Sequence, residues 1–395
     1  KHPLTVAARV VKLFGKHPID VTRETLSVTE SIPRMLEFGA VYSRFEPGSI
    51  RARVAATTAA RDVTVDFLRA GVYGEVLNSI IPFFNASIQG VAKFGRVARQ
   101  NPRKAAIMAA AAITAPTLTL WWMHKDEPWY RTMPAWQKYA FWNFKVGDDI
   151  MRVPRPFEWG YVFGALPEAA MEYAYRKDPE ALKETLREMA KNMGPVDMTS
   201  PMAAVTSLTP TAISVPWEVM SNYDYFRDRN IVPYFMEKNN FAEDQYFPWT
   251  PTVVKRLGKA LGVSPLKVQH LLAGYTGSLA NDVLYGSEAA LEAAGAKKQD
   301  PDKVSDPSDR FVIGRFYARR PNPELELKRL EDSYEVINTR YNNRIQKMMD
   351  SGASEEEIND VVLDAANELA TIMERAALWQ PLLEEHLRKQ GDGGK

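Results

Sequence analysis

Residues 346–358 read Gln346-Lys347-Met348-Met349-Asp350-Ser351-Gly352-Ala353-Ser354-Glu355-Glu356-Glu357-Ile358, and this stretch decides the fold class. Gly352 is expected to end a long charged helix that begins at Pro323, because glycine readily adopts the backbone that closes a helix. Ser354 and Glu357 have the spacing of a capping box, which starts a second helix. Apolar residues recur after it at helical spacing: Ile358, Val361, Val362, Leu369, Ile372 and Met373. The segment is therefore predicted to form an αα-hairpin.

The preceding sequence also has helical spacing, and its many prolines divide it into short helices. Residues 167–192 predict an amphipathic helix pair, and Pro251 and Pro265 each mark a helix start. Alternation around residues 141–153 permits a small β-hairpin that turns at Gly147-Asp148-Asp149. We therefore predict a mainly α fold: an irregular multi-helix body with a small β-hairpin, followed by the C-terminal αα-hairpin.

Composition and charge divide the chain into four predicted parts. Ala, Gly, Lys and Asp are frequent after residue 286, which is typical of a linker. The sequence starts at Lys1 without the apolar core of a secretory signal, so we expect it to be part of a longer or processed chain. The parts are a basic N-terminal helical segment (1–64), the multi-helix core body (65–285), a flexible linker (286–322) and an acidic helical hairpin (323–395).

The composition excludes several classes of protein and of site. Of the 395 residues, 45% are hydrophobic and 25% are charged, which excludes wholesale disorder, collagen and a polytopic membrane protein. The absence of cysteine excludes disulfides, thiolate nucleophiles and cysteine-bound metals. The five histidines do not have metal-ligand spacing, and no nucleotide, zinc-protease or nucleophile-elbow motif occurs. We therefore expect no cofactor and no enzymatic activity.

The net charge of +1 conceals an asymmetry along the chain. Residues 1–104 contain 16 Lys and Arg against 8 Asp and Glu, whereas residues 322–395 contain 9 against 16. A basic segment of this kind predicts contact with phosphate, in DNA or in lipid headgroups. The alternative is a solvated helix face. The candidate contact residues are Lys93, Arg96, Arg99, Arg103 and Lys104.

Residues 105–123 contain no charged side chain, and as one helix they would extend over about 28 Å, close to the thickness of a bilayer core. Their seven alanines are only weakly apolar, and Pro116 is expected to interrupt the helix. We expect the segment to be buried in protein, and to meet lipid only in a second state in which lipid or neighbouring copies replace its partners within the molecule. The candidate residues for a buried or membrane helix are Ile107, Ile113, Leu118, Leu120, Trp121 and Trp122.

Aromatic and arginine side chains gather in two further segments, and these residue types commonly anchor protein interfaces. The interface candidates are Phe157, Trp159, Tyr225, Phe226 and Arg227, and the alternative is that these aromatics form core. Glu158 and Glu168 stand ten residues apart and offer a paired-carboxylate site. The alternative is that Glu158 faces solvent or caps the helix that follows Pro156.

Four strings occur in order over about residues 65–390. They are IPFFNASIQG at 81–90, RPFEWG at 155–160 with FGALPE at 163–168, NYDYFRDRNIVP at 222–233, and LLAGYTG at 271–277. Together they resemble the large polyvalent protein-associated domain of phages that is numbered 38. The resemblance brings no catalytic residue with it.

The resemblance implies a phage protein packaged in the capsid near the portal and delivered with the genome, which helps to form or line the DNA-ejection conduit through the host envelope. It further implies a homo-oligomer, with portal or internal virion proteins as partners and with phage DNA and the host envelope membrane as further candidates. The expected location is the virion, then the host envelope or cytoplasm. An injected effector that binds a host defence or transcription protein is the alternative from another class, and an enzyme with an unrecognised site is a third.

Overall fold

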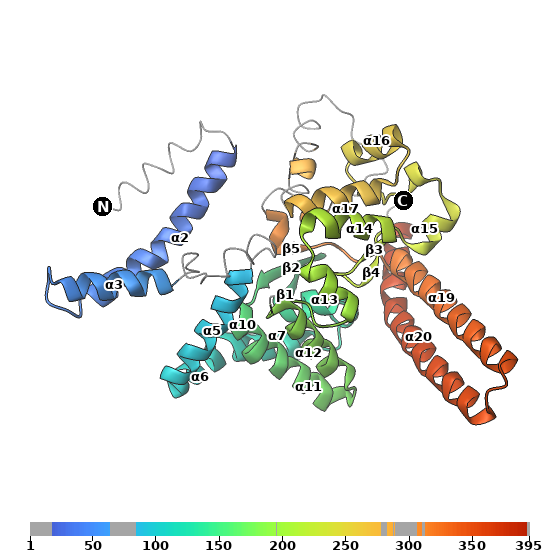
Figure 1. Cartoon of the computed structure of the whole chain (residues 1–395), viewed down its shortest axis with the longest axis horizontal. Helices are drawn as coiled ribbons and strands as arrows, with labels where there is room; N and C mark the ends of the chain where they lie inside the picture. Colours follow the sequence, from blue (N-terminus) through green and yellow to red (C-terminus); the bar gives the residue numbers. More distant parts are fainter. Residues whose placement is uncertain are drawn as a thin grey trace. The chain divides into compact units, whose positions relative to one another are not determined.

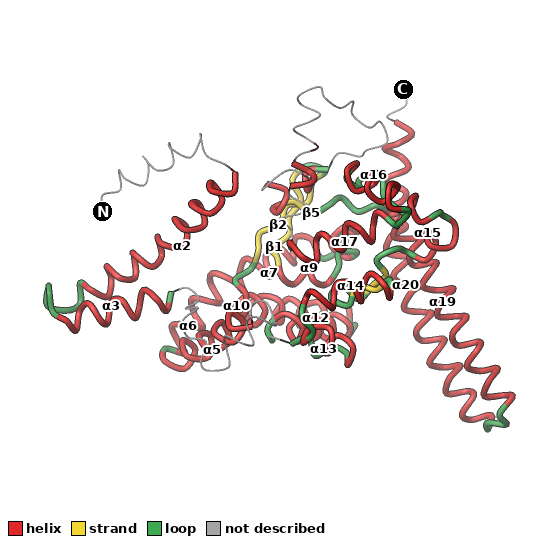
Figure 2. The backbone as a smooth tube through the Cα atoms, turned by 45° about the horizontal axis from the view of Figure 1, so that its top comes forward, coloured by secondary structure: helices red, strands yellow, loops and turns green. Residues whose placement is uncertain are grey.

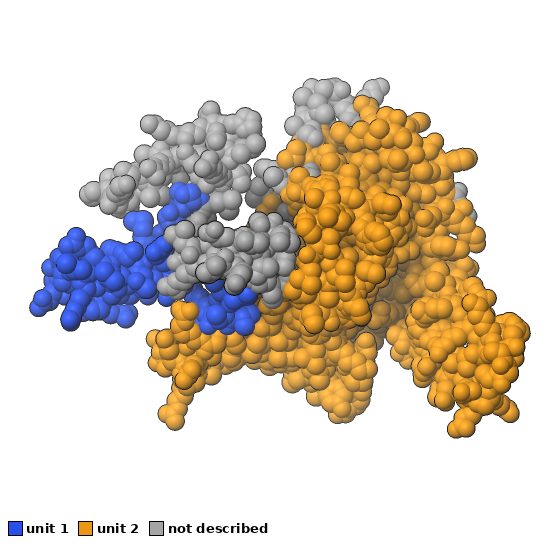
Figure 3. All heavy atoms as spheres, viewed as in Figure 1, with its two compact units in different colours: residues 1–93 blue, residues 94–395 orange. Residues whose placement is uncertain are grey.

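The computed structural model describes residues 18–63, 84–194, 196–277, 283–286, 288, 306–309 and 313–392. The chain divides into two compact units, residues 1–93 and 94–395 (Figure 3). The boundary between them falls within helix α5 (Phe84–Gln100). Residues 1–17, the first three residues of the string at 81–90, and most of the predicted linker between 289 and 305 lie outside the described residues.

In the described part of the first unit, helices α2 (Pro18–Tyr42) and α3 (Ile50–Asp62) pack against each other. Ala52 and Ala56 are fully buried in α3, because their small side chains allow the helices to approach closely. The hydroxyl of Ser49 accepts a hydrogen bond from the backbone N–H of Ala52 at 3.1 Å and caps the start of α3.

The second unit contains a small antiparallel sheet in the strand order β1–β2–β5. Strands β1 (Phe141–Val146) and β2 (Asp149–Pro154) form the predicted β-hairpin, and Gly147 adopts a φ of +62° in the turn. The third strand, β5 (Tyr317–Ala318), pairs with β2. It comes from the predicted linker, whose described residues 313–320 are therefore part of the body.

Short helices surround this sheet and give the second unit its mainly α character, as predicted (Figures 1 and 2). The predicted pair at 167–192 is present as α11 and α12, and the helices expected at Pro251 and Pro265 are α16 and α17. The helices are α6 (Pro102–Ala109), the π-turn η2 (Ala110–Thr114), α7 (Ala115–His124), α8 (Pro128–Arg131), α9 (Ala135–Ala140), α10 (Phe157–Gly160), the π-turn η3 (Tyr161–Ala165), α11 (Leu166–Arg176), α12 (Glu180–Asn192), α13 (Pro201–Leu208), α14 (Thr211–Ser221), α15 (Tyr234–Asn239), η4 (Ala242–Asp244), α16 (Thr252–Leu261), α17 (Pro265–Thr276), η5 (Pro307–Asp309) and η6 (Ile313–Phe316).

Three clusters of buried apolar side chains stand out in the described part of the second unit. One cluster lies beside the sheet and contains Trp121, Trp129, Tyr130, Met133, Ile150 and Ala318. A second joins α9, η3 and α11 through Tyr139, Tyr161, Ala165 and Ala169. A third lies near the short β3–β4 ribbon (Tyr223–Asp224 and Arg229–Asn230) and contains Val232, Met236, Phe247 and Leu266.

The C-terminal αα-hairpin is present, and we call its two helices, α19 (Pro323–Asp350) and α20 (Glu355–Asp392), the arm. The predicted capping box has formed: the Ser354 N–H donates to the Glu357 carboxylate at 2.9 Å, and the Glu357 N–H donates to the Ser354 hydroxyl at 3.3 Å. Figures 1 and 2 show the helices running side by side, with their turn directed away from the body. Near the other end of the arm, Leu382 packs on the cluster beside the sheet.

Candidate functional site

The helices α6, η2 and α7 form one continuous helix, Pro102–His124, which we call the apolar helix. In the part of the chain that the structure describes, it is the one helix long and apolar enough to cross a membrane, a judgement on length and composition alone. Only 22% of its most apolar 18-residue window is buried. Most of its surface is therefore not buried within the single chain, and burial against neighbouring copies stays a prediction.

The buried side chains of the apolar helix form a single stripe. They are Ala109, Ile113, Thr117 and Trp121, each four residues after the last and none more than 6% exposed. Of the other predicted residues, Leu118 and Leu120 are half-buried, while Ile107 and Trp122 are exposed. The helix thus rests on the body by one narrow edge and leaves a broad apolar face uncovered.

Pro116 does not interrupt the apolar helix, contrary to expectation, because the π-turn η2 precedes it by two residues. A proline clashes with the carbonyl four residues earlier, and a local π-turn moves that carbonyl aside. The same arrangement occurs at Pro167, which the π-turn η3 precedes by the same interval. There the displaced carbonyl, that of Phe163, accepts a hydrogen bond from the Thr114 hydroxyl at 2.6 Å. The two π-turns are therefore joined to each other.

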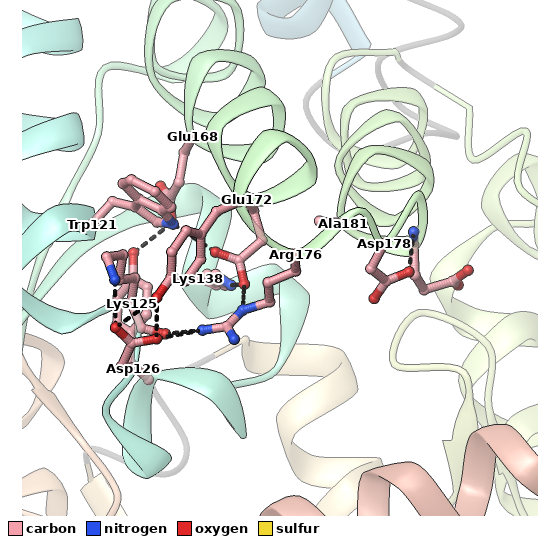
Figure 4. A network of polar contacts seen from close by, with 12 residues as sticks. Trp121, Lys125, Asp126, Lys138, Glu168, Glu172, Arg176, Asp178 and Ala181 are labelled. Carbon is pink, nitrogen blue, oxygen red and sulfur yellow. Dashed lines mark hydrogen bonds and ion pairs between the residues drawn. The ribbon is translucent and has the colours of Figure 1, made fainter.

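Polar contacts fix the C-terminal half of the apolar helix to α11. The Trp121 indole N–H donates to the Glu172 carboxylate at 2.6 Å, and Arg176 donates to the same carboxylate at 2.7 Å. Figure 4 shows Arg176 reaching from Glu172 to Asp126, which follows the helix. Burial raises the pKa of Glu172, but Lys138, Trp121 and Arg176 outweigh it, so that this pKa lies below its usual value.

A second buried carboxylate, that of Glu168, lies one turn earlier on α11 and is fully buried. The Arg155 guanidinium donates to one of its oxygens at 2.5 Å, and the Tyr130 hydroxyl donates to the other at 2.5 Å. Burial and the neighbouring Glu168 raise the pKa of Tyr130 well above its usual value. Both oxygens of Glu168 are enclosed and hydrogen-bonded, so this carboxylate holds the fold together. Glu158 is half-buried in the first turn of α10, and the two side chains do not form an open catalytic pair.

The strings at 155–160 and 163–168 are explained by this buried ion pair. A Cβ atom at Gly160 would lie 2.6 Å from the Cβ of Arg155. A Cβ at Gly164 would lie 3.3 Å from the side chains of Arg155, Ile113 and Thr117. Glycine at both positions lets α10 and η3 close over the arginine and over the apolar helix.

The strings at 222–233 and 271–277 also make packing contacts. The Asn222 side chain bonds both the N–H and the C=O of Val232, at 2.9 and 3.0 Å, and so closes the loop between α14 and α15. A Cβ at Gly274 would lie 2.6 Å from Val215, which explains the close crossing of α14 and α17. His270 on α17 contacts Glu218 at 2.8 Å. No group of three or more His, Asp or Glu side chains suited to a metal ion occurs among the described residues.

The predicted phosphate contacts are all exposed and lie on α5 and α6. The Lys93 ammonium donates to the backbone carbonyl of Val63 at 2.8 Å. Arg96 and Arg99 line a surface hollow together with Gly95 and Gln100. Arg103 and Lys104 stand at the start of the apolar helix, and contact with phosphate stays a prediction for these side chains.

The predicted interface residues divide into exposed and internal side chains. Phe157 and Phe226 are mostly exposed, and a Lys191 ammonium lies 4.6 Å above the Phe226 ring. Trp159 is half-buried and stacks on Phe163 at 5.4 Å, so it is at least partly core. Tyr225 is half-buried as well, and Arg227 is paired with the buried Asp224 at 2.7 Å.

Comparison with known proteins gives one result. Residues 127–306 match the model of a family described as large polyvalent protein associated domain 38. The match contains the strings at 155–168, 222–233 and 271–277, and the string at 81–90 and the apolar helix lie before it. No curated protein and no solved structure matches the chain.

Proposed function

We propose, from the premise that residues 127–306 belong to the large polyvalent protein associated domain 38 family, that the chain is a structural, virion-associated phage protein. It is packaged in the capsid near the portal and delivered with the genome. After delivery, copies of the chain help to form or line the conduit through which DNA crosses the host envelope. The proposed role is structural and includes no catalytic step.

The observation that carries this proposal is the uncovered face of the apolar helix. Ile107, Met108, Trp122 and Met123 are each 59–69% exposed, an unusual solvent exposure for apolar side chains in one helix. The 23 residues of Pro102–His124 extend over about 34 Å, enough for a bilayer core of about 30 Å. This face therefore suits lipid better than it suits water.

The two ends and the opposite face of the helix agree with a membrane role. Arg103 and Lys104 stand at its start, where lipid headgroups would lie, and Trp122 stands near its end, where indole rings favour the membrane boundary. Thr114 and Thr117 lie on the side turned toward the body, where they make hydrogen bonds. The helix therefore has an apolar outer face that suits lipid and an inner side that these hydrogen bonds fix to the body.

The absence of cysteine allows a direct test with one label per molecule. Ala111→Cys places an environment-sensitive fluorophore on the uncovered face, and Ala260→Cys places it on the exposed side of α16 as the control. With vesicles containing anionic lipid, the label at 111 should move to an apolar environment and be quenched by a quencher attached to lipid tails. The label at 260 should stay in water.

If vesicles change neither the emission of the label at 111 nor its quenching by lipid tails, the proposal is contradicted. A chain that also stays monomeric with vesicles and captures a defined host protein would instead favour the injected effector. Binding that brings both labels to the surface, without quenching by lipid tails, would reduce the role of the helix to adsorption on the membrane and would also contradict a conduit.

A further inference from the structure

The arm has an acidic outer face. On α20, Val361 and Ala365 are buried against α19, whereas Glu356, Asp360 and Asp364 recur every four residues on the exposed side. Leu363 is 61% exposed among these carboxylates. Within the described part of the chain, none of the three acidic side chains takes part in an ion pair. This face, Glu356, Asp360, Leu363 and Asp364, is called the acidic face below.

A surface of opposite charge lies on α5 and α6. Arg99, Arg103 and Lys104 are exposed and form no ion pair with another described residue. The sequence contains no Asp or Glu between Glu75 and Asp126, so no carboxylate nearby along the chain balances them. Ile107, 69% exposed, follows one turn after Arg103. Arg99, Arg103, Lys104 and Ile107 are called the basic face below.

The two faces match in charge and in composition, since each places one large exposed aliphatic side chain beside three like charges. They do not meet within one molecule. The arm is fixed to the body far from its turn, through Leu382 and through ion pairs of Arg375 with Glu184 and of Lys389 with Asp148. Figure 1 shows the turn of the arm, next to the acidic face, leading away from α5 and α6.

We infer that, in the particle, the acidic face of one copy docks onto the basic face of the next copy. Such a contact joins different surfaces of identical chains, so it is heterologous and yields a ring if the rotation closes, or a filament if it does not. The inference rests on the proposed homo-oligomer and names its interface. Inside the particle, a DNA phosphate would satisfy the charge of the basic face but would leave Ile107 uncovered, which favours a protein partner that brings an apolar side chain.

Charge reversal tests this interface on the full chain. Arg99→Glu with Arg103→Glu, and separately Glu356→Lys with Asp360→Lys, should each weaken self-association at least tenfold in sedimentation at low salt. Combining all four substitutions should restore self-association, because attraction returns with the signs exchanged. Matched controls are Arg256→Glu with Lys259→Glu on α16 and Glu331→Lys with Glu335→Lys on α19, which change the net charge equally at other exposed positions. These controls should associate as the unaltered chain does.

The results distinguish docking between copies from binding of phosphate by the basic face. Restoration in the combined variant, with weakening by salt, supports the inference, because exposed charges are screened by salt. If the reversals leave self-association unchanged, the inference is wrong although the proposed conduit still stands. If only the Arg99 and Arg103 reversal has an effect, and its effect is loss of binding to DNA or anionic vesicles, the basic face is a phosphate surface and the inference is likewise overturned.

Discussion

Replacing Glu168 with leucine should destabilise the second unit strongly, because Arg155 would be left buried and charged without its partner. Both side chains are nearly or fully enclosed, and they meet at 2.5 Å. Breaking a buried ion pair from one side costs about 3–5 kcal/mol, since the remaining charge keeps its desolvation penalty. Tyr130 also loses its hydrogen-bond acceptor, which places Glu168→Leu at the upper end of that range.

Two companion variants separate the ion pair from simple loss of packing. Tyr130→Phe removes one hydrogen bond to a charged group and should cost about 1.5–3 kcal/mol. Arg155→Met combined with Glu168→Leu removes both charges, so it should recover most of the loss, because apolar replacement of a whole buried pair is often neutral. Glu158→Gln, on the half-buried Glu158, is the matched control and should change the free energy of unfolding by less than about 0.5 kcal/mol.

The assay is equilibrium urea unfolding at pH 7, followed by tryptophan fluorescence, since Trp121 and Trp129 lie in the adjoining core cluster. A loss below about 1 kcal/mol for Glu168→Leu would refute the reasoning. A double variant no more stable than Glu168→Leu alone would refute it as well, because the unpaired guanidinium would then not be the cause.

Three further predictions use the same assay. Thr114→Val should cost about 1–3 kcal/mol because the displaced carbonyl of Phe163 loses its donor, while Thr114→Ser should be nearly neutral; equal losses would contradict the role of the hydroxyl. Gly274→Ala should cost about 1–3 kcal/mol through collision with Val215, and adding Val215→Ala should relieve part of it; no relief would place the strain elsewhere. The pKa of folded Glu172 is lowered, so its carboxylate contributes stability above its usual pKa and loses that contribution as the pH falls through the folded pKa. Stability of Glu172→Gln should therefore fall less steeply than that of the unaltered chain on acidification below about pH 4.5, and parallel curves would contradict the assignment.

Elements set by neighbouring residues could be predicted from the sequence. The arm follows from Gly352 and the Ser354–Glu357 capping box, and the β-hairpin follows from Gly147 between two alternating segments. In both cases a turn residue and the periodicity beside it act over a few positions. The strand β5 is only two residues long, so it has no periodicity to detect, and its pairing with β2 crosses more than 160 positions.

The candidate site depends on contacts that local patterns do not contain. The residues around Pro116 contain no pattern that predicts a π-turn. The displaced carbonyl of Phe163 accepts its hydrogen bond from Thr114, which lies 49 positions away in the sequence. The one-sided burial of the apolar helix likewise depends on which residues of α11 and η3 it meets. One signal was available: Arg155 and Glu168 are charged side chains inside an aromatic-rich stretch, where a buried ion pair is a reasonable expectation.

The most direct test of the proposed function is cryo-electron microscopy of the phage particle before and during genome ejection. Before ejection, we expect several copies of the chain inside the capsid near the portal, joined in a ring. During ejection, we expect the same chain at the host envelope, with the apolar helix at the depth of the bilayer around the DNA path. A particle that contains no copy of the chain, or a chain recovered after ejection only as a free monomer in the host cytoplasm, would contradict the account.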